Sequence, residues 1–116
     1  MAPCYTLIMT HAVHDAIGLA LAQHVAAGLP MHPEWIDLAQ SNLDRWSRRN
    51  HDSPTLLACY REWQSLLERP LDEVRAILLD PTSECQRLRQ NSPFVGVLSP
   101  SQVWQIKRQI HEALAT

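Results

Sequence analysis

The chain has 116 residues, of which 46% are hydrophobic and 19% are charged, a balance typical of a folded globular protein rather than a disordered one. A domain of this size buries about two-thirds of its unfolded surface, so it needs neither a disulfide nor a metal ion to fold. The formal net charge of −2 argues against a general nucleic-acid coat protein but leaves room for a local basic surface.

The charged residues are distributed unevenly. Residues 1–44 contain four acidic residues and no Lys or Arg, whereas all ten basic residues follow, nine of them arginine. The arginine bias and the small size indicate a bacterial protein from a GC-rich genome.

The three cysteines are far apart, which favours free thiols in a reducing cytoplasm. No apolar run reaches membrane-spanning length, so we expect a cytoplasmic protein with no membrane contact.

The first predicted helix covers residues 11–28. Val13, Ile17, Leu21 and Val25 recur at four-residue steps, as on one face of a helix. Alanines between them make the helix slim, so that a neighbour can approach closely, and a Gly–Leu–Pro sequence ends it. Residues 1–10 are interpreted as an N-terminal extension that need not be ordered, outside a single domain at 11–116.

Prolines mark the starts of the remaining predicted helices. Proline is well tolerated at the first position of a helix, because its missing N–H has no partner there. Ser53, Asp80 and Ser99 stand directly before such prolines and are good helix caps. The predicted helices are 33–49, 54–68, 71–79, 82–90 and 100–114, and they begin around Pro33, Pro54, Pro70, Pro81 and Pro100.

An apolar stretch, Phe94 to Leu98, lies between Pro93 and Pro100. Its side chains are too apolar for a solvated loop, so we expect them to cover the helical core. A short extended piece at 94–98 and an exposed patch for a partner are the alternatives. The pattern as a whole predicts an all-α, single compact domain of five to six helices, with a short apolar connecting loop at 92–99.

Candidates for chemistry are few. His11 and His14 would share a helix face beside Asp15, but two imidazoles do not complete a zinc site. Cys85 lies near a helix start before Arg87 without an evident histidine base. The sequence lacks glycine-rich phosphate loops and the usual hydrolase motifs. We therefore expect no metal, no cofactor and no catalytic residues.

Arginine and tryptophan, the residues most often at the energetic centre of interfaces, supply the candidate partner-binding residues. Trp46 lies in "DRWSRRN", and the four tryptophans are otherwise expected in the core. Cations at helix C-termini also offset the helix dipole without any partner. The candidate set is Arg45, Trp46, Arg48, Arg49, Arg87, Arg89, Phe94, Lys107 and Arg108.

These observations favour a small non-catalytic helical module for protein–protein interaction: an adaptor, inhibitor, antitoxin-like partner or subunit, with a homodimer as one form. The alternative is a nucleic-acid-binding regulator that uses the arginine clusters. No helix-turn-helix spacing supports that reading. A metal- or thiol-dependent enzyme built on His11, His14 or Cys85 is the remote alternative.

Overall fold

A computed structural model describes the backbone of residues 2–115 and the side chains of residues 12–114. Within residues 2–115 the chain forms six α-helices and no strand, which confirms the all-α prediction. The helices are α1 (Ala2–Gly28), α2 (Trp35–Arg49), α3 (Pro54–Leu67), α4 (Leu71–Leu79), α5 (Ser83–Arg89) and α6 (Pro100–Ala115).

Helix α1 begins at Ala2, earlier than the start expected at residue 11. The side chains of residues 1–11 lie outside the described residues, so the interpretation of 1–10 as an extension stays a prediction. The other end is as expected, since α1 ends at Gly28. There the Nε–H of Arg75 donates a 2.8 Å hydrogen bond to the carbonyl oxygen of Ala26, which satisfies a carbonyl in the last turn.

The capping predictions are confirmed at two of the three sites. The Ser53 hydroxyl accepts from the Leu56 amide ahead of α3. Ser99 and Gln102 bond each other's backbone N–H groups at the start of α6, which is a capping box.

The start of α5 differs from the sequence prediction. Its cap is Thr82, whose hydroxyl accepts from the Cys85 amide, so Pro81 lies before the helix. Asp80 instead accepts from the Thr82 amide at 2.8 Å. This hydrogen bond holds the pKa of the Asp80 carboxyl below its ordinary value.

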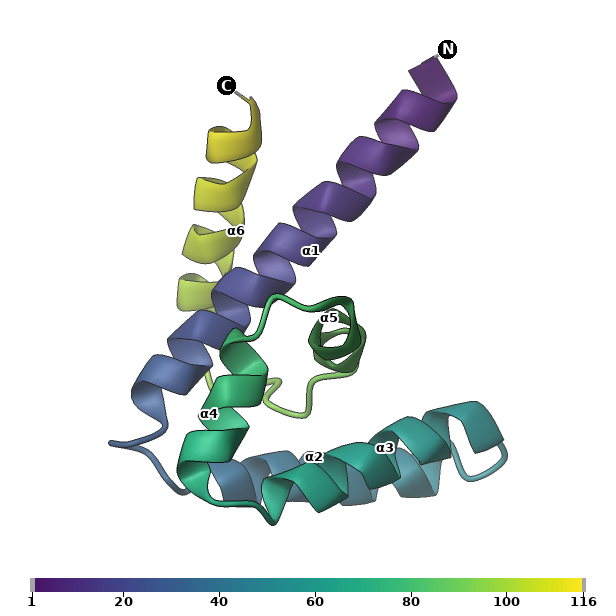
Figure 1. Ribbon diagram of the computed structural model, residues 1–116, viewed down its shortest axis with the longest axis vertical. Helices are drawn as coiled ribbons and strands as arrows, with labels where there is room; N and C mark the ends of the chain where they lie inside the picture. The colour runs from purple at the N-terminus through teal and green to yellow at the C-terminus, as the bar shows by residue number, and fades with distance from the viewer. Residues whose placement is uncertain (1, 116) are drawn as a thin grey trace.

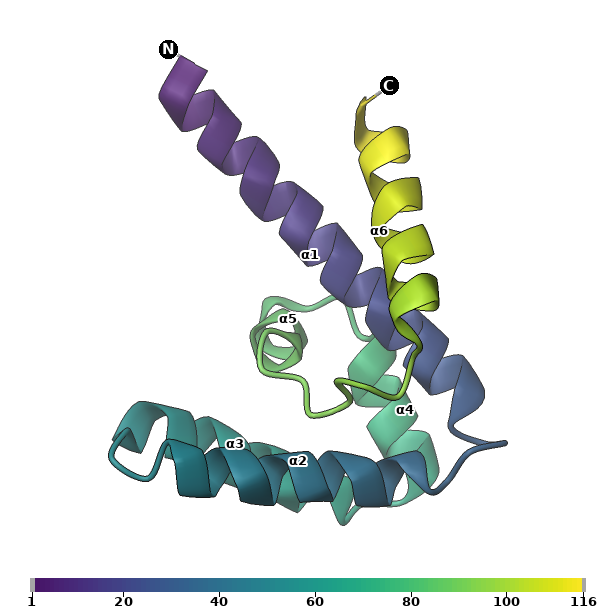
Figure 2. The same cartoon turned by 180° about the vertical axis from the view of Figure 1, so that it is seen from behind.

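The helices are arranged around α1, as Figures 1 and 2 show. Helix α1 packs on α4, α5 and α6, while α2 and α3 pack on each other as a hairpin across the base of the molecule. The start of α1 and the end of α6 lie at the same end of the molecule (Figure 1). The two helices diverge towards that end. The molecule is therefore a forked helical assembly on a hairpin base.

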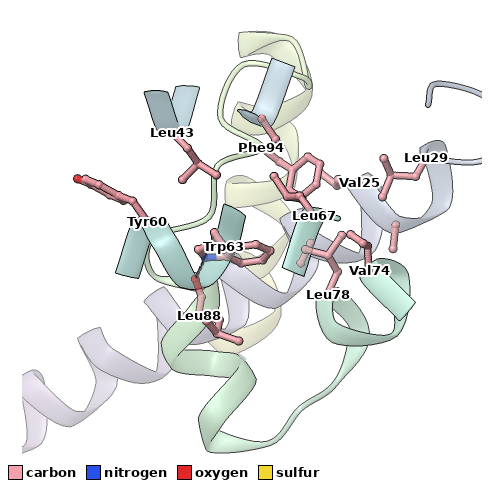
Figure 3. Packing of buried hydrophobic residues seen from close by; sticks show 13 residues of the cluster. Val25, Leu29, Leu43, Tyr60, Trp63, Leu67, Val74, Leu78, Leu88 and Phe94 are labelled. Atoms are coloured by element: carbon pink, nitrogen blue, oxygen red, sulfur yellow. Dashed lines mark hydrogen bonds between the residues drawn. The ribbon is translucent and has the colours of Figure 1, made fainter. Parts of the chain in front are cut away.

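Trp63 lies at the centre of the core, with only 1% of its surface exposed. Its indole N–H donates a 2.9 Å hydrogen bond to the Leu88 carbonyl oxygen, drawn as a dashed line in Figure 3. Its ring meets Phe94 edge-on, with centroids 6.3 Å apart. The apolar side chains of the same cluster come from α1 to α5 and from the residue after α1: Ala22, Val25, Ala26, Leu29, Ala39, Leu43, Tyr60, Leu67, Val74, Leu78 and Leu88. Helix α6 contributes Ile106, which is buried outside this cluster.

The loop at 92–99 covers this core with Phe94, Val97 and Leu98, as the sequence predicted, but the prediction that Val95 also covers it is wrong. Phe94 is 5% exposed and Pro93 is also fully buried, but the next residue, Val95, is 64% exposed. Gly96 then adopts a φ of 94°, a conformation that side chains disfavour. The backbone forms turns rather than a strand between residues 94 and 98. The loop therefore buries one large side chain and displays its neighbour.

Candidate interaction surface

The arginines at the end of α2 do not join the other basic residues. The Arg45 guanidinium donates to the Asn42 side-chain oxygen, and Arg48 and Arg49 are exposed. They lie at the closed end of the α2–α3 hairpin, far from α6 (Figures 1 and 2). Trp46 is half-buried and packs against Tyr60, with ring centroids 5.8 Å apart. This end of the hairpin therefore presents cations without an exposed aromatic anchor.

Arg87 is occupied by intramolecular ion pairs. Its guanidinium contacts the carboxylate of Glu62 at 2.8 Å and that of Glu84 on its own helix. These contacts raise the pKa of Arg87 and lower the pKa of Glu84. A guanidinium shared by two carboxylates is a weak candidate for binding an external anion.

Phe94 is also placed away from the surface. Its ring packs on Trp63 in the core. Phe94 therefore stabilises the fold, and the prediction that it contacts a partner is wrong. The exposed apolar residue of the loop is its neighbour Val95.

Trp104 on α6 is the exposed tryptophan, with 60% of its surface accessible. It borders a groove formed with Leu98, Pro100, Val103 and Lys107. We define the Trp104 surface as Leu98, Pro100, Val103, Trp104, Lys107 and Arg108. The arrangement combines an accessible aromatic ring, an apolar groove and two cations.

Arg108 holds the Trp104 ring in place from one side. Its guanidinium carbon lies 5.4 Å from the ring centroid, within the range of a cation–π contact. Its Nε also donates to Glu112 at 3.0 Å. Both contacts limit the motion of the exposed ring, and an anchor that is already ordered loses less entropy on binding.

The sequence reasoning placed Trp104 with the core residues of α6, but a signal in the sequence separates it from them. Val103, Ile106 and Ile110 follow one another at helical spacing and are at least half-buried. Residues of a helix are offset by about 100° each, which turns Trp104 well away from that stripe. The sequence contains no signal for the role of Asn42. Asn42 is a buried polar residue of α2, and its hydrogen-bond partners in the loop are more than 50 residues away in the sequence.

Arg89 and Lys107, which are distant in the sequence, are brought to one cavity of about 510 Å³ between α1, α5 and α6. His14, Asp15 and His111 line the same cavity. Two of the candidate basic groups therefore converge, whereas the cluster on α2 stays apart.

Among the described residues, the histidines and cysteines considered for metal or thiol chemistry are not grouped into a site. His11 lies outside the residues whose side chains are described, and among those that are described no three His, Cys, Asp or Glu side chains are grouped to hold a metal ion. Cys59 and Cys85 are free thiols, each half-buried; Cys4 falls outside the described side chains. Within the described part of the chain, no helix combines the length and apolarity needed to cross a membrane.

Comparison of the chain with models of known protein families, with curated proteins and with solved structures gives no match.

Proposed function

We propose that this protein is a non-catalytic helical interaction module that binds a protein partner through the Trp104 surface. The observation that carries the proposal is the exposure of Trp104 beside an apolar groove. The other three tryptophans belong to the core or pack against it. An accessible tryptophan next to arginine is the side-chain combination that dominates binding energy at protein interfaces.

The charge of this surface indicates the chemistry of the partner. Lys107 and Arg108 flank the groove, and Glu112 is paired with Arg108 alone. A partner segment with one apolar side chain for the groove and acidic residues beside it would complement both features. The free thiols suit the reducing cytoplasm of a bacterial cell as the place of this interaction.

The nucleic-acid alternative has less support. The cations at the end of α2 lie apart from those of α5 and α6, and Arg87 is paired with two glutamates. Phosphate binding depends on many cations that act together along one face. A gel shift with mixed DNA and RNA at low salt tests this alternative, since binding that weakens steeply with salt would favour it over a protein partner.

The proposal is tested by affinity capture from the native host with three baits: wild type, Trp104→Ala and Leu79→Ala. Leu79 is a matched control, because it is 44% exposed on α4, away from the groove. A captured protein counts as a partner only if it binds the purified wild-type chain directly. We expect the Trp104→Ala variant to bind it at least about tenfold more weakly and the Leu79→Ala variant to bind it normally.

Two results would contradict the proposal. One is equal loss of the partner with both variants. The other is a partner that retains full affinity for Trp104→Ala at an unchanged melting temperature. Self-association through the same surface would appear in analytical ultracentrifugation as a dimer that Trp104→Ala dissociates, and it would identify a second copy of the chain as the partner.

A further inference from the structure

Gly18 occupies an unusual position in the interior of α1. A glycine inside a helix lowers stability relative to alanine, so a mid-helix glycine usually has a packing reason. Gly28 has one, because a Cβ there would lie 2.5 Å from the Trp35 ring. A Cβ at Gly18 would meet no atom within 4 Å among the described residues. The absent side chain leaves open space rather than room for a neighbour.

That space belongs to two adjoining cavities. The first, which we call the polar cavity, is the one of about 510 Å³ lined by His14, Asp15, Gln86, Arg89, Lys107 and His111. The second, the apolar cavity, has about 260 Å³ and is lined mainly by Leu21, Val25, Phe94, Val95, Leu98 and Val103. Gly18, Arg89 and Lys107 line both, so the two cavities meet at a glycine and two cations.

The polar cavity has the donors that an anion requires. Its cationic side chains are Lys107 and Arg89, and Nη1 of Arg89 also donates to the carbonyl oxygen of Asp80. Asp15 is its one carboxylate among the described residues. Among the described residues, the exposed ammonium group of Lys107 takes part in none of the ion pairs. The amide of Gln86 and the imidazole rings of His14 and His111 line the same cavity and can donate further hydrogen bonds. An incoming carboxylate would supply the counter-ion that Lys107 lacks.

We propose that the two cavities together bind a small amphipathic anion, such as a medium-chain carboxylate. Its head group contacts Lys107 and Arg89, and its alkyl chain runs past Gly18 into the apolar cavity. Concave, largely apolar sites with a few convergent polar groups are typical of small-molecule binding. The position of the cations at the junction favours a ligand with one charged end over a polyanion or a neutral lipid.

Isothermal titration calorimetry of the full chain with decanoate, below its micelle concentration, tests the proposal. We expect saturable binding of one decanoate per chain. Decanol has the same chain without the charge, and acetate has the charge without the chain. Each should bind at least about tenfold more weakly than decanoate, because each keeps only one half of the interaction.

Two variants locate the site. Gly18→Leu should abolish binding, because the new side chain fills the junction of the cavities, and Lys107→Gln should weaken binding about tenfold by removing one charged contact. Arg61→Gln, an exposed arginine on α3 outside both cavities, is the matched charge control and should bind decanoate normally. Lys107→Gln decides the result if Gly18→Leu lowers the melting temperature.

The proposal is overturned if wild type does not bind decanoate, if decanol binds equally well, or if decanoate binding survives Lys107→Gln unchanged. The cavities share Leu98, Val103 and Lys107 with the Trp104 surface, but Trp104 lines neither cavity, so a change at Trp104 separates this proposal from the proposed function. Trp104→Ala should lose the protein partner and keep decanoate.

Discussion

The side-chain amide nitrogen of Asn42 donates a 2.8 Å hydrogen bond to the carbonyl oxygen of Pro93. The same nitrogen donates to the Val95 carbonyl oxygen at 2.9 Å, and Asn42 is itself buried. A helix residue thus supplies both N–H groups of its amide to a loop that has no strand to pair with. This arrangement fixes the loop over the core.

Replacement of Asn42 should therefore destabilise the whole domain. We expect Asn42→Ala to lower the free energy of unfolding by about 1–3 kcal/mol, because it leaves buried carbonyl groups without donors. Urea denaturation measures this change. Ser41→Ala, at an exposed neighbouring position, should change it by less than about 0.5 kcal/mol. Equal effects at both positions would show that the loop does not depend on the amide.

Two adjacent loop residues should behave oppositely on truncation. Phe94→Ala removes a buried ring that packs on Trp63, and we expect a loss of about 3–5 kcal/mol. Val95→Ala removes mostly exposed surface and should change stability by at most about 0.5 kcal/mol. Thermal and urea unfolding of the two variants provide the comparison. A large loss from Val95→Ala would contradict the inward and outward placement of the two side chains.

Replacement of the two glycines of α1 by alanine should change stability in opposite directions. Gly18→Ala should stabilise the protein by about 0.5–1 kcal/mol, since alanine is the better helix former and nothing obstructs its methyl group. Gly28→Ala should destabilise it by about 1–3 kcal/mol, because the methyl group would overlap the Trp35 ring and displace it. The sign of each change in melting temperature decides the prediction.

The ion pairs of Arg87 give an acid dependence with a defined sign. Its hydrogen bond and charge lower the pKa of Glu84 from the ordinary value of 4.5. A carboxyl with a lowered folded pKa contributes its full stabilisation above the unfolded value, and that stabilisation is lost as the pH falls through the folded pKa. Stability should therefore decrease as the pH falls below 4.5.

Arg87→Gln should make this acid dependence shallower, because it removes the group that lowers the pKa of Glu84. Guanidinium denaturation of both proteins across the acid range from pH 6 downward measures the slope. Arg61→Gln controls for the loss of a surface charge. Slopes that are equal in wild type and Arg87→Gln would contradict the role of the ion pairs; the effect is expected to be small because these groups are exposed.

The sequence predicted the helices well because their starts depend on local chemistry. Proline, Ser53 and Ser99 act within a few residues of themselves, and the structure places α3 and α6 where these residues indicated. The loop at 92–99 was predicted correctly as a cover of the core for Phe94, Val97 and Leu98, because apolar side chains favour burial, but not for Val95, which is exposed. The start of α5 was less accurate because Thr82 and Asp80 compete for the same cap position.

The candidate surface was harder to predict because it depends on tertiary packing. Arg87 and Glu62 are 25 residues apart, so their pairing has no local signal. The convergence of Arg89 with Lys107 requires the crossing of α1 with α5 and α6. Trp104 is the exception, because the helical spacing of Val103, Ile106 and Ile110 already indicates that it faces away from the side of α6 that packs.

The partners of α1 also set an order in which the domain can assemble. It packs mainly on α4, α5 and α6, all of which follow residue 70, whereas α2 and α3 pack on each other as neighbours in the sequence. Local pairings form quickly, while distant ones wait for loop closure. During synthesis, the face of α1 that packs on α6 therefore stays uncovered until α6 has left the ribosome. A chain interrupted before that point would expose this face to chaperones and proteases.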